Sequence, residues 1–218
     1  SAASNVVTAH TLLAPVTGVT EGGASTTAID ISWNDTTGET GYRVERLVSG
    51  VTWTLVGTTA ADVHTFANTG LVAGTLYYYR VRAVNAGGSS LVPANTPATT
   101  IPAAPTLTGT VASDTQINLG WSNVAGETNY VLQRSDDGVN GWTTIASPLV
   151  NVIGYTNTAL TADTSYFYRV VAHNVSGDSA ASNVVTAHTL LPAVTGLTAT
   201  GVSTTEIDLS WADSNGES

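Results

Sequence analysis

The chain contains no cysteine among its 218 residues and no lysine, because all six basic residues are arginine. The absence of cysteine excludes disulfide bonds, thiolate metal ligands and a cysteine nucleophile. Charged residues make up only 10% of the chain, and the formal net charge is −10. Phosphate binding needs clustered lysine and arginine. The scattered arginines of this acidic chain therefore argue against nucleic acid as a partner.

Long apolar runs are also absent. No segment reaches the roughly 18–20 apolar residues of a membrane span, so we expect no membrane insertion within this segment. Hydrophobic residues nevertheless make up 42% of the chain, enough to form cores rather than remain disordered. A lack of cysteine fits a cytosolic protein as well as a secreted one. We predict an extracellular or cell-surface location.

What the chain does have is internal repetition. Residues 1–13 recur letter for letter as residues 179–191, and the similarity continues without a gap from 18–39 to 196–217. This long period is 178 residues, and Trp33, Trp121 and Trp211 mark half-periods of 88 and 90. A fixed period of this kind indicates an array of similar units. The sequence resembles an excerpt from a longer array of such domains.

Each repeat alternates apolar and polar residues over short runs. Ile29, Ile31 and Trp33 fall on one face of the first such run, and Tyr77 and Tyr79 fall on one face of a later run. A period of two is that of a strand with one packed face. No stretch keeps a helical period. The pattern predicts an all-β chain of tandem antiparallel β-sandwiches.

These residues resemble the fibronectin type III family, of the kind found in bacterial and archaeal cell-surface repeat proteins. The early tryptophan is followed by Tyr-x-Val/Leu, at Tyr42 and Tyr130. The pattern Leu-x5-Tyr-x-Tyr-Arg-Val-x-Ala-x-Asn occupies residues 71–85, and residues 160–174 repeat it with Val in one variable position. The resemblance implies a tyrosine corner at Tyr77 and at Tyr166. It implies little about activity, because such sandwiches host many functions.

The repeats predict the domain organisation. Residues 14–101 and 102–191 are two complete domains, residues 1–13 match the last strand of a preceding repeat, and residues 192–218 match the first two strands of a following one. Neither end can bury its apolar face alone. Either flanking domains or a neighbouring molecule complete the ends, or the ends are boundaries within a longer repetitive chain. The junctions are short, apolar and proline-containing, which predicts semi-rigid linkers.

No set of polar residues converges as a catalytic, cofactor or metal site would require, so we expect none and predict that the chain is not an enzyme. Asp136-Asp137 before Gly138 is typical of a hairpin turn. A Gly-Glu-Thr/Ser triplet recurs, and its glutamate is expected to form a local hydrogen bond to backbone or to a nearby arginine. The histidines are expected to be solvent-facing strand residues. The glutamates of the triplet are Glu39, Glu127 and Glu217, and the histidines are His10, His64, His173 and His188.

The outward faces of corresponding strands differ between the two repeats. The first repeat carries Arg43, Glu45, Tyr78, Arg80 and Arg82, and the second carries Val131, Gln133, Phe167, Arg169 and Val171. A contiguous apolar patch often marks an interaction surface. We hypothesise that Val131, Phe167 and Val171 contact another chain. The alternatives are that a nearby loop covers them, or that they are scattered surface hydrophobic residues without a partner.

Two Asn-x-Ser/Thr sequons, at Asn34 and Asn174, lie in predicted loops and are possible glycosylation sites. In a chain rich in serine and threonine, such matches also arise by chance.

These features favour a structural extracellular repeat protein that forms a semi-rigid rod, as part of a surface fibre, sheath or filament. Its partners would be copies of itself or neighbouring repeats. One alternative is an adhesin or carbohydrate-binding stalk, with polysaccharide as its partner. The other is a set of spacer domains in a secreted polysaccharide-degrading enzyme.

Overall fold

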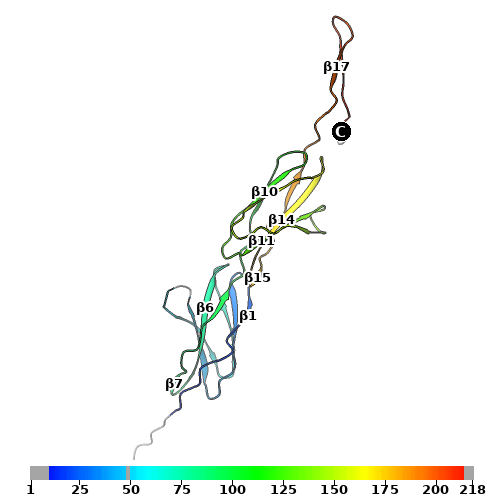
Figure 1. Ribbon diagram of the computed structural model, residues 1–218. Helices are drawn as coiled ribbons and strands as arrows, with labels where there is room; N and C mark the ends of the chain where they lie inside the picture. The colour runs from blue at the N-terminus through cyan, green and yellow to red at the C-terminus, as the bar shows by residue number, and fades with distance from the viewer. Residues whose placement is uncertain (1–9, 48–49, 214–218) are drawn as a thin grey trace, which may run out of the picture. The chain divides into compact units, whose positions relative to one another are not determined.

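The computed structural model describes residues 10–47 and 50–213 (Figure 1). Most of the residues predicted as the preceding repeat's last strand, and Glu217 of the recurring triplet, lie outside these ranges. All regular secondary structure in the described residues is β-strand. Among them there is no helix of the length and hydrophobicity that a membrane crossing requires. Contacts group the described residues into two compact units, one of those up to Ala103 with Val124–Thr128 and His173–Ser179, the other of the rest.

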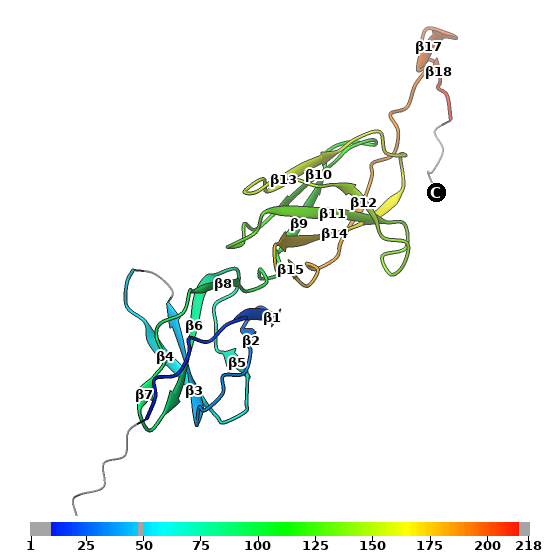
Figure 2. The same ribbon diagram turned by 60° about the horizontal axis from the view of Figure 1, so that its bottom comes forward.

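The first sandwich consists of two antiparallel sheets (Figure 2). One sheet has the order β1-β2-β5, and the other has the order β4-β3-β6-β7 with β8 also pairing with β6. The strands are β1 (Thr20–Ala24), β2 (Ala28–Ser32), β3 (Gly41–Leu47), β4 (Thr54–Ala60), β5 (Thr65–Thr69), β6 (Leu76–Asn85), β7 (Gly88–Ser89) and β8 (Thr96–Thr99).

The core of this sandwich forms where the apolar faces of its two sheets meet. Ile29 and Ile31 of β2 pack in one cluster with Tyr42 of β3 and Tyr79 of β6, all at most 1% exposed. Trp33 meets the Tyr42 ring edge to face, with centroids 5.3 Å apart. Alternation along the strands is therefore the physical origin of the layered core.

The second sandwich repeats this arrangement. Its sheets have the orders β13-β10-β9 and β12-β11-β14-β15, with β16 also pairing with β14. Trp121 and Tyr130 reproduce the ring contact, at 5.7 Å. The strands are β9 (Leu107–Val111), β10 (Ile117–Trp121), β11 (Asn129–Ser135), β12 (Thr143–Ala146), β13 (Gly154–Asn157), β14 (Ser165–Asn174), β15 (Gly177–Asp178) and β16 (Val185–His188).

The expected tyrosine corners are confirmed in both sandwiches. The Tyr77 hydroxyl accepts the Val72 N–H at 2.9 Å, and the Tyr166 hydroxyl accepts the Thr161 N–H at 3.0 Å. Both donors lie five residues upstream of the tyrosine, as the family pattern implies.

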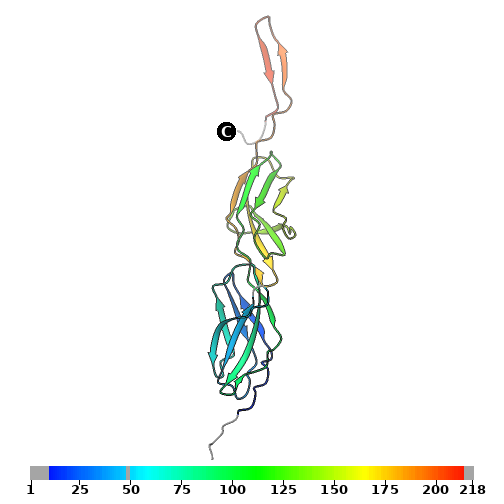
Figure 3. The ribbon, with the colours of Figure 1, turned by 90° about the vertical axis from the view of Figure 1, so that its left-hand side faces the viewer.

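The third repeat is represented by a hairpin of β17 (Thr198–Gly201) and β18 (Ile207–Ser210) (Figure 3). Its apolar residues are exposed, and Trp211 after β18 is 59% exposed. The equivalent Trp33 and Trp121 are only 3% and 5% exposed. The same sequence pattern is buried only where the remaining strands of a repeat cover it.

Candidate functional site

The outer face of the β4-β3-β6 sheet carries a layered stack of side chains. Arg80 of β6 lies over the ring of Trp53, with its guanidinium carbon 4.4 Å from the ring centroid. Its Nε donates to Oε2 of Glu45 at 2.6 Å. Glu45, although charged, is only 7% exposed. A charge-assisted hydrogen bond and a cation–π contact together hold Arg80 in place.

Two more arginines lie on the same face. Arg43 and Arg82 are directly opposite each other in the β3–β6 pairing. An Arg43 nitrogen lies 3.9 Å from Oε1 of Glu45, and its side chain is 42% exposed. Arg82 donates from Nε and Nη2 to the carbonyl of Ser90, at 3.2 and 3.1 Å. Three guanidinium groups thus accompany one carboxylate, and this face has a net positive charge.

The second sandwich keeps the stack but changes its charge. Arg169 lies over Trp142, with a distance of 4.3 Å to the ring centroid. Its Nε donates to the neutral Oε1 of Gln133 at 2.7 Å. Valines occupy the two positions that correspond to Arg43 and Arg82. One cation remains where the first sandwich has three cations and an anion.

The three residues proposed to contact another chain, Val131, Phe167 and Val171, lie on neighbouring strands of this sheet. All three are half-buried rather than open to solvent. A Cβ placed on Gly138 would lie 2.6 Å from the Phe167 ring, so the turn packs directly on that ring. The loop alternative therefore accounts for Phe167, and an interchain contact stays a prediction.

The covering loop is held by its own hydrogen bonds. The Ser135 hydroxyl donates within this loop and also accepts the Gly138 N–H at 3.1 Å. A carboxylate oxygen of Asp137 accepts the N–H groups of Val139 and Asn140, at 2.8 and 2.7 Å. These two backbone donors favour the charged carboxylate and lower the pKa of Asp137. The predicted hairpin turn between β11 and β12 is confirmed and is rigidly tied.

Carboxylates gather at one end of the first sandwich. Ligand oxygens of Asp35, Glu39 and Asp62 lie within 4.8 Å of one another. Asp35 accepts the Tyr42 hydroxyl at 2.6 Å, and Glu39 accepts the Asp62 N–H at 2.8 Å. The backbone bond expected for the glutamate of the Gly-Glu-Thr triplet is thus confirmed at Glu39. Sequence reasoning missed the cluster, because its members are separated along the chain.

The second sandwich keeps a glutamate, Glu127, but has amides in place of Asp35 and Asp62. Asn123 accepts the Tyr130 hydroxyl at 2.7 Å, as Asp35 accepts that of Tyr42. Nδ2 of Asn123 donates to Oδ1 of Asn151 at 2.7 Å. An attractive hydrogen bond thus replaces two like charges. The acidic cluster of the first sandwich is a local feature with partners of its own, and exposed acidic groups alone do not make a metal site.

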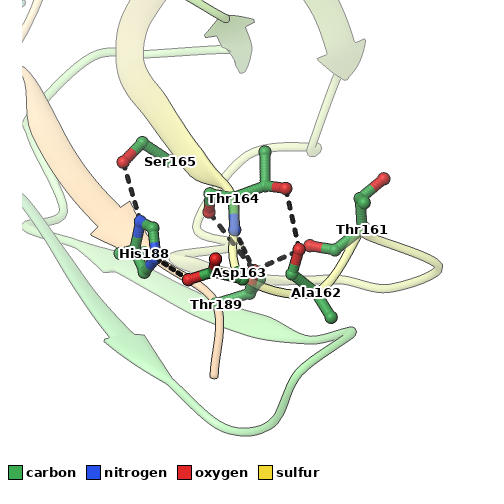
Figure 4. Close-up of polar contacts among 7 residues, drawn as sticks. All are labelled: Thr161, Ala162, Asp163, Thr164, Ser165, His188 and Thr189. Carbon is green, nitrogen blue, oxygen red and sulfur yellow. Dashed lines mark hydrogen bonds and ion pairs between the residues drawn. The ribbon is translucent and has the colours of Figure 1, made fainter. Parts of the chain in front are cut away.

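A serine, a histidine and an aspartate are aligned at the end of β16 (Figure 4). Nδ1 of His188 lies 2.9 Å from the Ser165 hydroxyl, and Nε2 lies 2.8 Å from Oδ1 of Asp163. Nucleophilic catalysis also needs donors for an oxyanion. The N–H groups of Asp163 and Thr164 are already bound to the Leu190 carbonyl and the Thr189 hydroxyl. The cluster therefore fastens the last strand to the preceding turn.

The other histidines are dispersed. His173 of β14 is half-buried, with Nδ1 2.6 Å from Oδ1 of Asp178. His10 and His64 are exposed, as expected. Their assignment to strands was wrong, because His10 lies outside the strands and His64 directly precedes β5, after a turn that contains the positive-φ residue Asp62.

The two sequons differ in accessibility. Asn34 is exposed, and its Nδ2 donates to the Thr17 hydroxyl at 3.2 Å. Asn174 is 2% exposed, and its side-chain oxygen accepts the Ser176 N–H at 2.9 Å. Burial counts against Asn174 as a glycan acceptor, while glycosylation at Asn34 stays a prediction.

Comparison with known proteins agrees with this geometry. The fibronectin type III domain model matches residues 14–101. The chain also aligns with a two-domain fibronectin type III segment of chicken tenascin, with a TM-score of 0.51 and 12% identity over 80% of this chain and 99% of that one. Residues 14–101 are a fibronectin type III domain, and the second sandwich has the same fold.

Relatives with these domains include bacterial enzymes. The chain is 34% identical to Exoglucanase B of Cellulomonas fimi over 89% of its own length and 19% of the enzyme. It is 34% identical to Chitinase A1 of Niallia circulans over 77% of its length and 24% of that enzyme. The chain thus spans a quarter or less of the length of these curated relatives. A fibronectin type III domain is typically a non-catalytic module. The matched segment is a small part of each relative, and the names of the relatives describe the whole enzymes.

Proposed function

We propose that this chain is a non-catalytic spacer segment of a secreted polysaccharide-degrading enzyme. The observation that carries the proposal is the match of most of the chain to small parts of an exoglucanase and a chitinase. Endoglucanase B of Cellulomonas fimi adds a third such match, at 37% identity over 88% of this chain. These comparisons support the spacer alternative better than the surface fibre that the repeats alone favoured.

The two sandwiches have the features that a spacer segment requires. Each sandwich has its own core, so neither depends on a ligand to bury its apolar residues. The arrangement that comes nearest to a catalytic group, around His188, has its neighbouring backbone donors engaged. A spacer has only to fold independently and keep other domains apart, and both sandwiches meet the first of these demands.

The test is to isolate the native polypeptide from culture medium with an antibody raised against this chain. We expect one polypeptide, larger than the 22.3 kDa of this segment, with hydrolytic activity on cellulose or chitin. The purified segment serves as the control and should hydrolyse neither polymer. Activity of the segment itself, or a native protein without any hydrolytic activity, would overturn the proposal.

A second candidate is the structural array. Its specific support is the letter-for-letter recurrence of residues 1–13 as 179–191, since near-identical repeats suit a polymer whose units contact only their neighbours. Electron microscopy of the same native material separates the two candidates. Filaments with a regular axial repeat would favour the array, whereas isolated particles with hydrolytic activity would favour the spacer.

A further inference from the structure

Arg43 and Arg82 of the first domain face each other, and this arrangement lowers the stability of the fold. Like charges directly opposite each other on a sheet face are destabilising. Arg43 and Arg82 occupy such a pair, and the single carboxylate of the face, Glu45, already binds Arg80 at 2.6 Å. Valines at the equivalent positions in the second domain show that the fold does not require arginine there.

The charge of this face is also opposite in sign to the net charge of the whole chain. The net charge is −10, yet three of the six arginines lie on this one sheet face with one glutamate. No carboxylate within the described residues lies in ion-pair range of Arg82, whose side chain instead binds the Ser90 carbonyl. The surface is therefore locally positive on an otherwise acidic molecule, and it attracts anions.

The spacing of these side chains suits an extended anion. Guanidinium groups bind carboxylates through two parallel hydrogen bonds. Tyr78, Arg80 and Arg82 alternate along β6 and are all half-buried, which forms a row of about 13 Å at the usual rise per residue. A row of cations with an aromatic ring at one end fits a linear polymer that presents carboxylates and the apolar faces of sugar rings.

We propose that the outer face of the β4-β3-β6 sheet in the first domain binds an anionic polysaccharide of the uronic-acid type. Arg43 and Arg82 bind its carboxylates, and Tyr78 contacts a sugar ring. Arg80, held between Trp53 and Glu45, keeps the face rigid. The choice of a polysaccharide over other polyanions rests on the proposed function, whereas the positive face does not.

The binding test uses the whole 218-residue chain and polygalacturonate as the probe, by affinity electrophoresis and titration calorimetry. Hydroxyethylcellulose is the neutral comparison polymer. We expect retardation by polygalacturonate alone, and an affinity that falls as salt rises. No retardation by polygalacturonate, or equal binding to the neutral polymer, would overturn the proposal.

The second domain supplies the variants. R43V/R82V installs the residues that the second domain carries at these positions, and we expect an affinity loss of at least about tenfold, since hydrogen bonds to charged groups are the strong ones. Adding V131R/V171R to that variant should restore binding on the other domain. Thermal unfolding of each variant distinguishes lost binding from lost folding, which matters because Arg82 also anchors Ser90.

A charge-matched control tests whether the site is specific. T65E/T69E also lowers the net charge by two, but at exposed positions of β5 in the opposite sheet. We expect its affinity to stay within about twofold of the parent chain. An equal loss in both variants would mean non-specific attraction and would overturn the site.

Sedimentation without polysaccharide tests the other occupant, a second copy of the chain. A dimer that R43V/R82V abolishes would assign the face to self-association and overturn the proposal. Failure of polygalacturonate binding would leave the spacer function standing, because the activity of the isolated native protein does not depend on this face.

Discussion

The two complete domains share one scaffold and differ in its charges. Each has a tryptophan–arginine stack on the outer sheet face and a tyrosine corner. The first domain adds two arginines to that face and two aspartates to one end, where the second has valines and amides. The shared features maintain the fold, and the differing ones are free to acquire a function. Each prediction below breaks or sharpens that comparison.

The largest effect should separate complete from partial repeats. Trp33→Ala removes a side chain that is 3% exposed, and we expect the first domain to lose about 3–5 kcal/mol of unfolding free energy. Trp211→Ala removes the repeat equivalent, which is 59% exposed, and should leave denaturant unfolding of both domains unchanged. Similar losses for both variants would show that the third repeat is packed in solution.

The next effect concerns the anion of the stack. Glu45→Gln gives the first domain the residue found at Gln133 and keeps an acceptor for Arg80. We expect a loss of about 1–2 kcal/mol by urea unfolding, since the ion pair with Arg80 becomes a hydrogen bond to a neutral amide among three cations. Gln133→Glu in the second domain should not destabilise it. A destabilisation of equal size there would contradict a charge-based account.

Two turn glycines compare packing with backbone strain. Gly138 has φ +74° and lies against the Phe167 ring. Gly50 has φ +77°, and among the residues that the structure describes no atom outside its chain neighbours lies within 4 Å of the place where a Cβ would lie. Ala at Gly50 should cost about 1 kcal/mol for the left-handed backbone alone. Gly138→Ala should cost about 1 kcal/mol more, because Phe167 must move. Equal thermal stabilities would show that the loop does not cover Phe167.

A smaller, stabilising effect is expected at the carboxylate cluster. Asp62→Asn gives the first domain the amide found at Asn151 and removes one of three neighbouring charges. We expect a gain of up to about 1 kcal/mol at low salt, with the gain shrinking as salt is added. A loss of stability would show that the charge of Asp62 is needed.

Titration of the core tyrosines has the smallest effect at neutral pH, because it takes place only in alkaline solution. Burial raises the pKa of Tyr42 and that of Tyr79 to about 12 from the ordinary 10.0, so both stay neutral in the folded state. Their contribution to stability is complete below pH 10 and is lost as the pH rises towards 12. Denaturant midpoints should fall across that window, and less steeply in Tyr42→Phe. A midpoint that does not change between pH 10 and 12 would contradict the burial of these hydroxyls.

Much of the fold could be predicted because its causes are local. Alternation along 76–85 and 165–174 determines which residues face the core, and Tyr77 and Tyr166 form their corners with donors only five residues away. The outward residues of both sheets could be identified in the same way. Which of them are open could not, because Phe167 is covered by a turn that lies far from it in the sequence.

By itself, the sequence determined the repeat, the strands and the faces, because a period of two and a turn need only neighbouring residues. The tertiary structure alone decided which side chains meet. It placed Arg43 opposite Arg82, gathered Asp35, Glu39 and Asp62, and aligned His188 between Ser165 and Asp163. The physical reason is strand register: contacts between distant segments depend on which residues pair across a sheet, and a shift of one residue would turn every side chain to the other face.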